Sequence, residues 1–364
     1  MDEGLKKILL VTFSDNADHQ DTLYGMYEQL IDIYNVYLLT INTPKVSVKK
    51  SDKTWFVDCP KRPGITKKTF DLKLLFSIIK RIRKQKFDVI YFESLHIWNL
   101  PIIMMSGKAR TYHVIHEVIP HEGDKQVKMV DLMNRMLVKI TDIIVLRNKL
   151  YVSEMTKRYG IDANRVKYVE LWRRYPGFTE PQYSKKVLFF GRINPYKGAD
   201  NLLEIAKMCP DIQFEVIGRV DIQVQDIIDN LNQLSNVKMN TEYVTDAQMK
   251  RAFEDADVVI VPYNSASQSG IIIDAYKYSR PVVGFSVGAI PEQIKDGKTG
   301  YLIEYKNNAL FAQKIRELLN LSNDEFLQVC KYSYEYGLKK YGVSNAVARF
   351  KKLMETSYEK SIIN

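Results

Sequence analysis

The sequence has few cysteines, no long apolar run and neither of the two common glycine patterns that bind phosphate. Its three cysteines are scattered and odd in number, which argues against a disulfide framework and against a zinc site. No apolar stretch approaches the roughly 20 residues that a membrane-spanning helix needs. The absence of G-x-G-x-x-G after the first apolar segment, and of G-x-x-x-x-G-K-[ST] anywhere, disfavours a dinucleotide oxidoreductase and a P-loop NTPase. The opening residues MDEGLKKILLVTFS lack the basic start of a signal peptide, so we expect a cytoplasmic protein.

Positive charge is concentrated in one part of the chain. The net charge is +10, and residues 41–90 carry fourteen Lys and Arg against four Asp, an excess equal to the whole net charge. Such a basic segment favours a phosphate-rich partner, and an ordinary solvated face is the alternative. The run LKLLFSIIKRIRKQ within it is amphipathic, and we expect its Leu and Ile side to lie on an anionic membrane or else to pack on a sheet.

Short apolar runs alternate with helical patterns along the chain, and the alternation restarts after a proline- and aromatic-rich stretch at 176–184. This pattern predicts an α/β protein with two doubly wound Rossmann-like domains facing across a cleft, followed by a helical tail. We place the first domain at 1–180 and the second at 181–340. The last helix, 341–364, is expected to pack back on the first domain.

Polar and small residues follow several predicted strands of the second half. Because ligands of doubly wound sheets bind beyond the carboxyl ends of the strands, these residues are candidates for binding a diphosphate and, through the Asp274 carboxylate, a ribose diol. They are Gly191, Arg192, Lys197, Gly218, Arg219, Ser269, Gly270 and Asp274. A surface lysine at 197 and a dipole-stabilising acid at 274 are the simpler alternatives.

No group of residues has the spacing of a metal site. Asp255 and Asp257 form the one D-x-D triplet, at the end of the sheet away from the strand-end loops, and we interpret it as a solvated turn. Among the histidines, His116 is expected at a strand end, His19 in the loop after the first strand, and His113 on the opposite side of its strand.

The second half resembles the retaining glycosyltransferases of family 4, which have the GT-B fold. The resemblance is carried by FFGRINPYKGADNLLEIA, FEVIGR and ADVVIVPYNSASQSGIIIDAYKYSRPVVGFSVGAIPEQIKDGKTGYLIE. The first half resembles the acceptor domain of that family more loosely, through FDVIYFES and HVIHEVIPHEG.

The resemblance implies roles for the candidate residues. Arg192 and Lys197 would neutralise the donor diphosphate, and Tyr243 would join the donor site. The second acid of the family's E-x7-E motif matches Asp274, whereas the first falls on Ala266, so it is absent. The family's acceptor-domain histidine matches His116. His19 and Glu117 are further acceptor-side candidates.

The expected reaction is transfer of a sugar from a nucleoside diphosphate to a glycan or lipid-linked saccharide, without a cofactor or metal and at an anionic membrane surface. A catalytically inactive GT-B subunit that binds a glycan or a partner transferase is the alternative, because Ala266 replaces an acid. Nucleic-acid binding would rest on charge alone, since no recognised module supports it. A sugar-nucleotide epimerase would need further acids that the sequence does not place at the strand ends.

Overall fold

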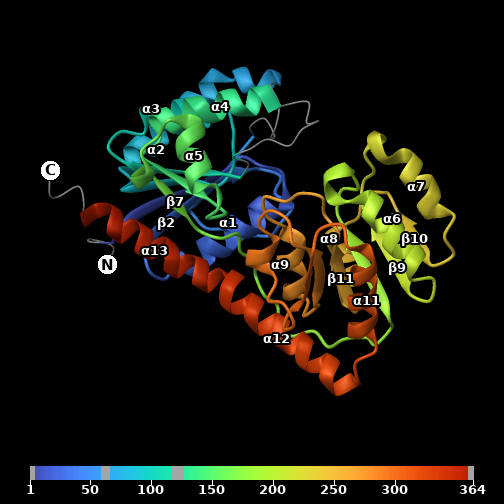
Figure 1. Ribbon diagram of the computed structural model, residues 1–364. Coiled ribbons are helices and arrows are strands. Elements are labelled where there is room, and N and C mark those ends of the chain that lie inside the picture. Colours follow the sequence, from blue (N-terminus) through green and yellow to red (C-terminus); the bar gives the residue numbers. More distant parts are fainter. Residues whose placement is uncertain (1–4, 59–65, 117, 119–126, 360–364) are drawn as a thin grey trace. The chain divides into compact units, whose positions relative to one another are not determined.

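The computed structural model describes residues 5–58, 66–116, 118 and 127–359, and it contains two α/β units (Figure 1). The first unit consists of Met1–Arg174 and Val343–Asn364, and the second of Tyr175–Gly342. Residues 175–180 therefore belong to the second unit. The second unit begins six residues earlier than the boundary drawn from the sequence. The buried Arg280 explains this attachment, because its guanidinium donates to the carbonyl oxygens of Thr179 and Glu180.

The first unit is built on a seven-stranded sheet in the order β3-β2-β1-β4-β5-β6-β7, and all its strands are parallel. Its strands are β1 (Lys7–Thr12), β2 (Asn35–Ile41), β3 (Thr54–Val57), β4 (Val89–Phe92), β5 (Arg110–Ile115), β6 (Ile143–Leu146) and β7 (Val166–Tyr168). Its helices are α1 (Ala17–Leu30), α2 (Leu72–Gln85), α3 (Asn99–Met105), α4 (Val127–Ile140), α5 (Tyr151–Tyr159) and α13 (Val343–Glu359).

Both faces of this sheet are covered by helices. Along β1, Ile8 and Leu10 join a core cluster with residues of α1 and α13, whereas Leu9 and Val11 join a cluster with residues of α2 and α3. Successive side chains of a strand point to opposite faces, so an unbroken apolar run is the signature of a strand buried on both sides.

The second unit contains a six-stranded parallel sheet in the order β10-β9-β8-β11-β12-β13. Its strands are β8 (Lys186–Phe190), β9 (Gln213–Ile217), β10 (Val237–Asn240), β11 (Val258–Val261), β12 (Val282–Phe285) and β13 (Gly300–Ile303). Its helices are α6 (Ala199–Met208), α7 (Gln225–Asn232), α8 (Asp246–Asp255), α9 (Gly270–Lys277), α10 (Ile290–Gln293), α11 (Asn308–Leu319) and α12 (Asn323–Tyr341), with a short 3-10 turn, η3 (Pro195–Lys197). The predicted pair of parallel α/β domains and the helical tail are confirmed.

Each sheet has one point at which the strand order reverses. In the first unit the chain moves outward from β1 through β2 to β3, then returns to place β4 on the other side of β1. In the second unit the corresponding reversal lies between β8 and β11. Loops that leave the carboxyl ends of the two central strands diverge at such a point and leave a crevice for a ligand. The candidate residues are therefore expected at these two crevices.

Helix α2 does not present its Leu and Ile side to solvent. Leu75, Ile78, Ile79 and Ile82 are buried in the core beneath the sheet, so the expectation that this side lies on a membrane is wrong, and the sheet-packing alternative holds. Among the helices of the described segments, none is both long and apolar enough to span a bilayer.

The interpretation of the D-x-D triplet as a solvated turn is wrong for its second acid. Asp257 is buried, and its carboxylate accepts hydrogen bonds from the backbone N–H groups of Tyr183 and Lys185 and from the Ser184 hydroxyl. Lys185 and Tyr183 have positive φ angles of 58° and 53°, a conformation that non-glycine residues seldom adopt. Asp257 thus holds the chain that enters β8, whereas Asp255 is exposed.

Replacing Asp257 tests this anchoring role. Asp257→Asn should lower the free energy of unfolding by about 1–3 kcal/mol, because it leaves buried backbone donors poorly satisfied. The exposed Asp255→Asn is the matched control and should stay within about 0.5 kcal/mol of the parent. Urea unfolding measures both values, and equal stabilities of the two variants would contradict the role.

Candidate active site

In the second unit, the loops after β8 and β11 are joined by backbone hydrogen bonds at the crevice. The carbonyl oxygen of Tyr196 accepts from the N–H groups of Asn264 and Ser265 at 2.9 and 3.2 Å. The Asn264 side-chain amide also donates to the carbonyl oxygen of Pro195 and to the Asp200 carboxylate. These contacts, made across a sequence gap of more than sixty residues, fix the turn η3 that carries Lys197.

Lys197 lies in this crevice without a carboxylate partner among the described residues. Its ammonium is 5.2 Å from the centroid of the Tyr263 ring and 2.8 Å from the point that a Cβ on Gly191 would occupy. Burial lowers the pKa of Lys197, and the like charge of Arg192 lowers it further. A half-buried cation near a second cation favours an anionic partner. Lys197 is half-buried rather than fully exposed, and its donor role stays a prediction.

Glycines let the backbone of the strand-end loops approach one another. Gly191 has a φ of 107°, and the Lys197 side chain and Ile271 of α9 both reach the position of its missing Cβ. A Cβ on Gly218 would lie 2.0 Å from the Gly191 carbonyl oxygen, so the loops after β9 and β8 touch backbone to backbone. This close approach of the two loops requires glycine at position 218.

The beginning of α9 differs from expectation in one respect. The Ser269 N–H is not available to a ligand, because it donates to the Gln293 side chain at 2.8 Å, and the Gln293 amide donates back to the Ser269 carbonyl oxygen. The N–H groups of Gly270 and Ile271 are the first of the helix and have no partner within it. These groups and the positive end of the helix remain as anion-binding features.

Gln293 was not identified from the sequence. Glu292 is exposed, while Gln293 is buried and clamps the loop that opens α9. A glutamine within the apolar stretch AIPEQI was the available signal, because a buried amide must find hydrogen-bond partners.

The remaining donor-side candidates occupy different environments. Arg192 and Arg219 are exposed just beyond β8 and β9, and the two loops are paired through a 2.8 Å bond from the Ile193 N–H to the Arg219 carbonyl oxygen. Tyr243 is exposed in the loop after β10. Asp274 is buried in α9, where only 3% of the residue is exposed.

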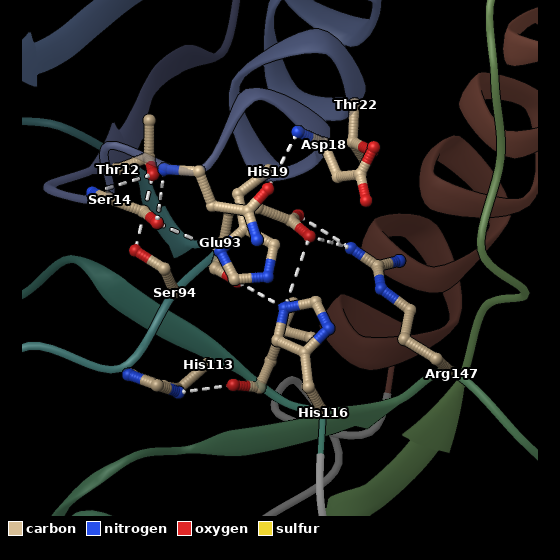
Figure 2. Close-up of polar contacts among 12 residues, drawn as sticks. Thr12, Ser14, Asp18, His19, Thr22, Glu93, Ser94, His113, His116 and Arg147 are labelled. Carbon is tan, nitrogen blue, oxygen red and sulfur yellow. Dashed lines mark hydrogen bonds and ion pairs between the residues drawn. The ribbon is translucent and has the colours of Figure 1, made fainter. Parts of the chain in front are cut away.

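In the first unit, His116 is the first residue after β5 and lies beside the crevice between β1 and β4 (Figure 2). Its Nε2 is 2.7 Å from the main-chain oxygen of Glu93 and 3.5 Å from the Glu93 carboxylate. The ring of His19, from the first turns of α1, stacks on the His116 ring with centroids 4.5 Å apart. His19 is itself held by Ser14, whose hydroxyl lies 3.0 Å from its Nδ1. The structure therefore brings His19 and His116 together.

Glu93, which contacts His116, is also part of a buried ion pair with Arg147. This pair was not identified from the sequence. Arg147 follows β6 and donates to both carboxylate oxygens of Glu93, which follows β4; both side chains are at most 1% exposed. The Arg147 guanidinium also stacks on Trp172 at 4.1 Å and reaches the Tyr91 hydroxyl at 3.0 Å. Burial raises the pKa of Glu93, and the Arg147 charge opposes that shift. Their positions immediately after strands were the signal that could have revealed both residues.

The expectations for His113 and Glu117 have different outcomes. His113 is fully buried on β5. Its ring lies 2.8 Å from the Asn99 amide and stacks on Phe92, so His113 is a core residue and does not join His116. Glu117 lies outside the described residues. Across the described segments, no group of three His, Cys, Asp or Glu residues is arranged to hold a metal ion.

Comparison with known proteins agrees with this architecture. Residues 184–321 match a family model described as glycosyl transferases group 1. A Klebsiella pneumoniae protein described as an uncharacterized 41.2 kDa protein in the cps region is 26% identical, with 78% of this chain and 83% of that protein covered. A D-inositol 3-phosphate glycosyltransferase of a Mycobacterium species is 25% identical over 61% of this chain, which spans about half the length of that relative.

Solved structures share the fold at low sequence identity. HepE from Anabaena, in complex with UDP and glucose, has a TM-score of 0.70 at 14% identity, covering 97% of this chain and all of that one. A sucrose-phosphate synthase from Thermosynechococcus elongatus has a TM-score of 0.70 at 13% identity, covering 98% of this chain and all of that one. The chain has the GT-B fold of these neighbours. The comparisons together support a glycosyltransferase.

Removing Arg147 tests the buried ion pair. Arg147→Met should lower the free energy of unfolding by about 3–5 kcal/mol, because it leaves the Glu93 carboxylate buried and unpaired. Without Arg147, the folded-state pKa of Glu93 rises further above its unfolded value. The loss should therefore be smaller at pH 5 than at pH 8, since the protonated carboxyl no longer carries an unpaired charge.

Chemical denaturation at both pH values measures these differences. The double variant Glu93→Gln, Arg147→Met should recover part of the loss. Arg135→Met, which breaks an exposed pair with Asp131, is the control and should cost no more than about 1 kcal/mol. A pH-independent loss in the Arg147 variant would refute a charge-based explanation.

Proposed function

We propose that the chain is a retaining glycosyltransferase of family 4 that transfers a hexosyl group from a nucleoside-diphosphate sugar to a glycan acceptor. The observation that carries the proposal is the half-buried Lys197 ammonium at the β8–β11 crevice, which the Arg192 charge influences and which has no carboxylate partner among the described residues. A diphosphate supplies the missing negative charge. HepE, which has the same fold, is known with UDP and glucose, and this supports a nucleotide-sugar donor.

The crevice offers positive charge where a leaving diphosphate would develop negative charge. Lys197, Arg192 and the first N–H groups of α9 would stabilise that charge, and such preorganised donors contribute strongly to catalysis. Since side chains and helix N–H groups supply this stabilisation, we propose that the reaction is metal-independent. The departing phosphate is the proposed acceptor of the proton from the attacking hydroxyl.

On the acceptor side, we propose His116 as the residue that contacts the sugar. The Glu93–Arg147 pair holds the backbone that accepts from His116, and the His19 ring limits its rotation. The acceptor is proposed to be a lipid-linked saccharide or a growing surface polysaccharide. The Klebsiella relative, described as belonging to a cps region, supports a polysaccharide role.

A binding-only GT-B subunit is the second candidate, and the absence of an acid at Ala266 favours it. Ala266 is buried, and its carbonyl oxygen accepts from the Ala289 N–H, so the loop is closed over a small side chain where a carboxylate is expected in the family. Nucleotide-sugar binding without release of free nucleotide in the presence of acceptor would decide for this candidate.

The first unit also has a surface suited to an anionic membrane, although not the one expected from the sequence. Three large apolar residues in and just before the first turns of α2 are exposed: Phe70 by 70%, Leu72 by 56% and Phe76 by 52%. Helix α3 packs against both α2 and α4 and adds the exposed Met104. Lys73 and Lys80 are exposed on α2 among these residues. We propose that this surface attaches the protein to the cytoplasmic face of a membrane.

Lys197→Ala tests the donor site. Loss of a charge-assisted contact should weaken nucleotide-sugar binding and turnover by roughly tenfold or more, since such contacts contribute about 1.5–3 kcal/mol. Lys207→Ala, an exposed lysine on α6, is the matched control and should behave as the parent. A screen of nucleoside-diphosphate sugars in EDTA, read as nucleotide release and as binding, gives both quantities. Parental binding in the Lys197 variant would exclude its donor role, and activity restored only by Mg²⁺ or Mn²⁺ would exclude metal independence.

Serine substitutions at Phe70, Leu72 and Phe76 test the membrane surface. The triple variant should lose most binding to phosphatidylglycerol vesicles, and parental binding should weaken with salt, because each Lys or Arg near such a surface contributes about 1 kcal/mol that salt screens. Ile222→Ser, which changes a still more exposed apolar residue of the second unit, is the control. Flotation with neutral and anionic vesicles measures the effect; negligible binding of the parent to both would remove the membrane proposal.

A further inference from the structure

A groove of about 880 Å³ lies within the first unit along β7, the edge strand of the sheet. Helix α5 forms one wall and α13 the other, and both are labelled in Figure 1. Its apolar lining includes Leu150, Val166 and Leu353. This volume falls in the range of pockets that bind small molecules, about 300–1,000 Å³.

The charges that line the groove are all positive. Lys149, Lys167, Arg349 and Lys352 contribute to its walls, and no carboxylate does among the residues that form it. Arg349 is ion-paired with Glu170 outside the lining, so the proposal uses the positive charges of Lys149 and Lys167. Cations gathered in a concave surface attract an anionic ligand more strongly than the same cations spread over a convex one.

One exposed aromatic ring stands among these cations. Tyr168, the last residue of β7, is 38% exposed, and its hydroxyl donates to Glu170 at 3.2 Å. Because Glu170 is held in turn by Arg349, the ring is anchored at its polar end, and Tyr168 is one of the residues that line the groove. A fixed aromatic face packs well against the apolar face of a sugar ring, and the lysines can pair with carboxylates or phosphates on the same chain.

The groove extends to the carboxyl end of the sheet, where His116 also lies. Lys149 and Leu150 come shortly after β6, and Tyr168 ends β7, so these residues share the carboxyl end of the parallel sheet with the residue that follows β5. We propose that the groove binds an acidic saccharide segment, bearing uronate or phosphate groups. We assign this segment to the acceptor, and that assignment rests on the proposed glycosyltransferase function.

Binding of an oligogalacturonate, without any donor, tests the groove directly. The parent protein should bind it more tightly than a neutral malto-oligosaccharide of the same length. The double variant Lys149→Ala, Lys167→Ala should weaken binding about tenfold or more, as expected when two cations near an anion are removed. Tyr168→Ala should also weaken it, whereas Tyr168→Phe, which keeps the ring, should retain most of the affinity.

Lys157→Ala is the matched control, because Lys157 is an exposed lysine of α5 that does not line the groove. Its affinity should equal that of the parent, and circular dichroism should show that every variant is folded. Equal binding of the acidic and neutral oligosaccharides, or equal losses in Lys157→Ala and the double variant, would overturn the proposal. The proposal would also be overturned if the double variant lost binding to phosphatidylglycerol vesicles but still bound oligogalacturonate normally. The groove would then bind a lipid headgroup.

Measuring donor binding and nucleotide release tests the proposed transferase function independently of saccharide binding in the groove. The double variant should keep parental donor binding, because all groove residues belong to the first unit. Saccharide binding by a protein that binds no nucleotide sugar would refute the transferase and leave the groove in place.

Discussion

Parallel strand pairing is the constraint on which both candidate sites depend. Each sheet contains only parallel pairs, so every strand ends at the same edge, and the reversal of strand order leaves one crevice at that edge. Lys197 and Gly191 reach the crevice of the second unit because they follow β8, while Glu93 reaches that of the first because it follows β4. The chemistry of both units therefore depends on which residues happen to follow the central strands.

The two candidate sites differ in whether their buried or half-buried charges are neutralised within the protein. Arg147 and Glu93 neutralise one another in the core of the first unit, and their cost of burial is offset by direct hydrogen bonds and by stacking on Trp172. Lys197 has no such partner among the described residues, and its pKa is lowered. A balanced pair suits a rigid support for His116, whereas an unbalanced cation suits a site completed by an anionic ligand.

Much of the candidate site was predictable because chain position after a strand is a local property. Gly191, Arg192 and Lys197 were found in this way, and so was the position of His116 at the end of β5. The face of α2 was assigned wrongly, because a Leu and Ile stripe is equally suited to a bilayer and to the underside of a sheet. Asp257 was taken as solvated because the sequence does not show that the chain around Tyr183 folds back onto it.

The amino-acid sequence by itself determined the alternation of strands and helices, hence the two parallel α/β units, and it placed cations and glycines at the strand ends. Only the tertiary structure decided how those ends are connected. Gln293 meets Ser269 across 24 residues and Arg147 meets Glu93 across 54, and both contacts arise from the packing of elements that are distant in the chain. Periodicity reports the burial of a side chain, but the partner of a buried polar group is chosen by three-dimensional proximity, which a linear pattern does not encode.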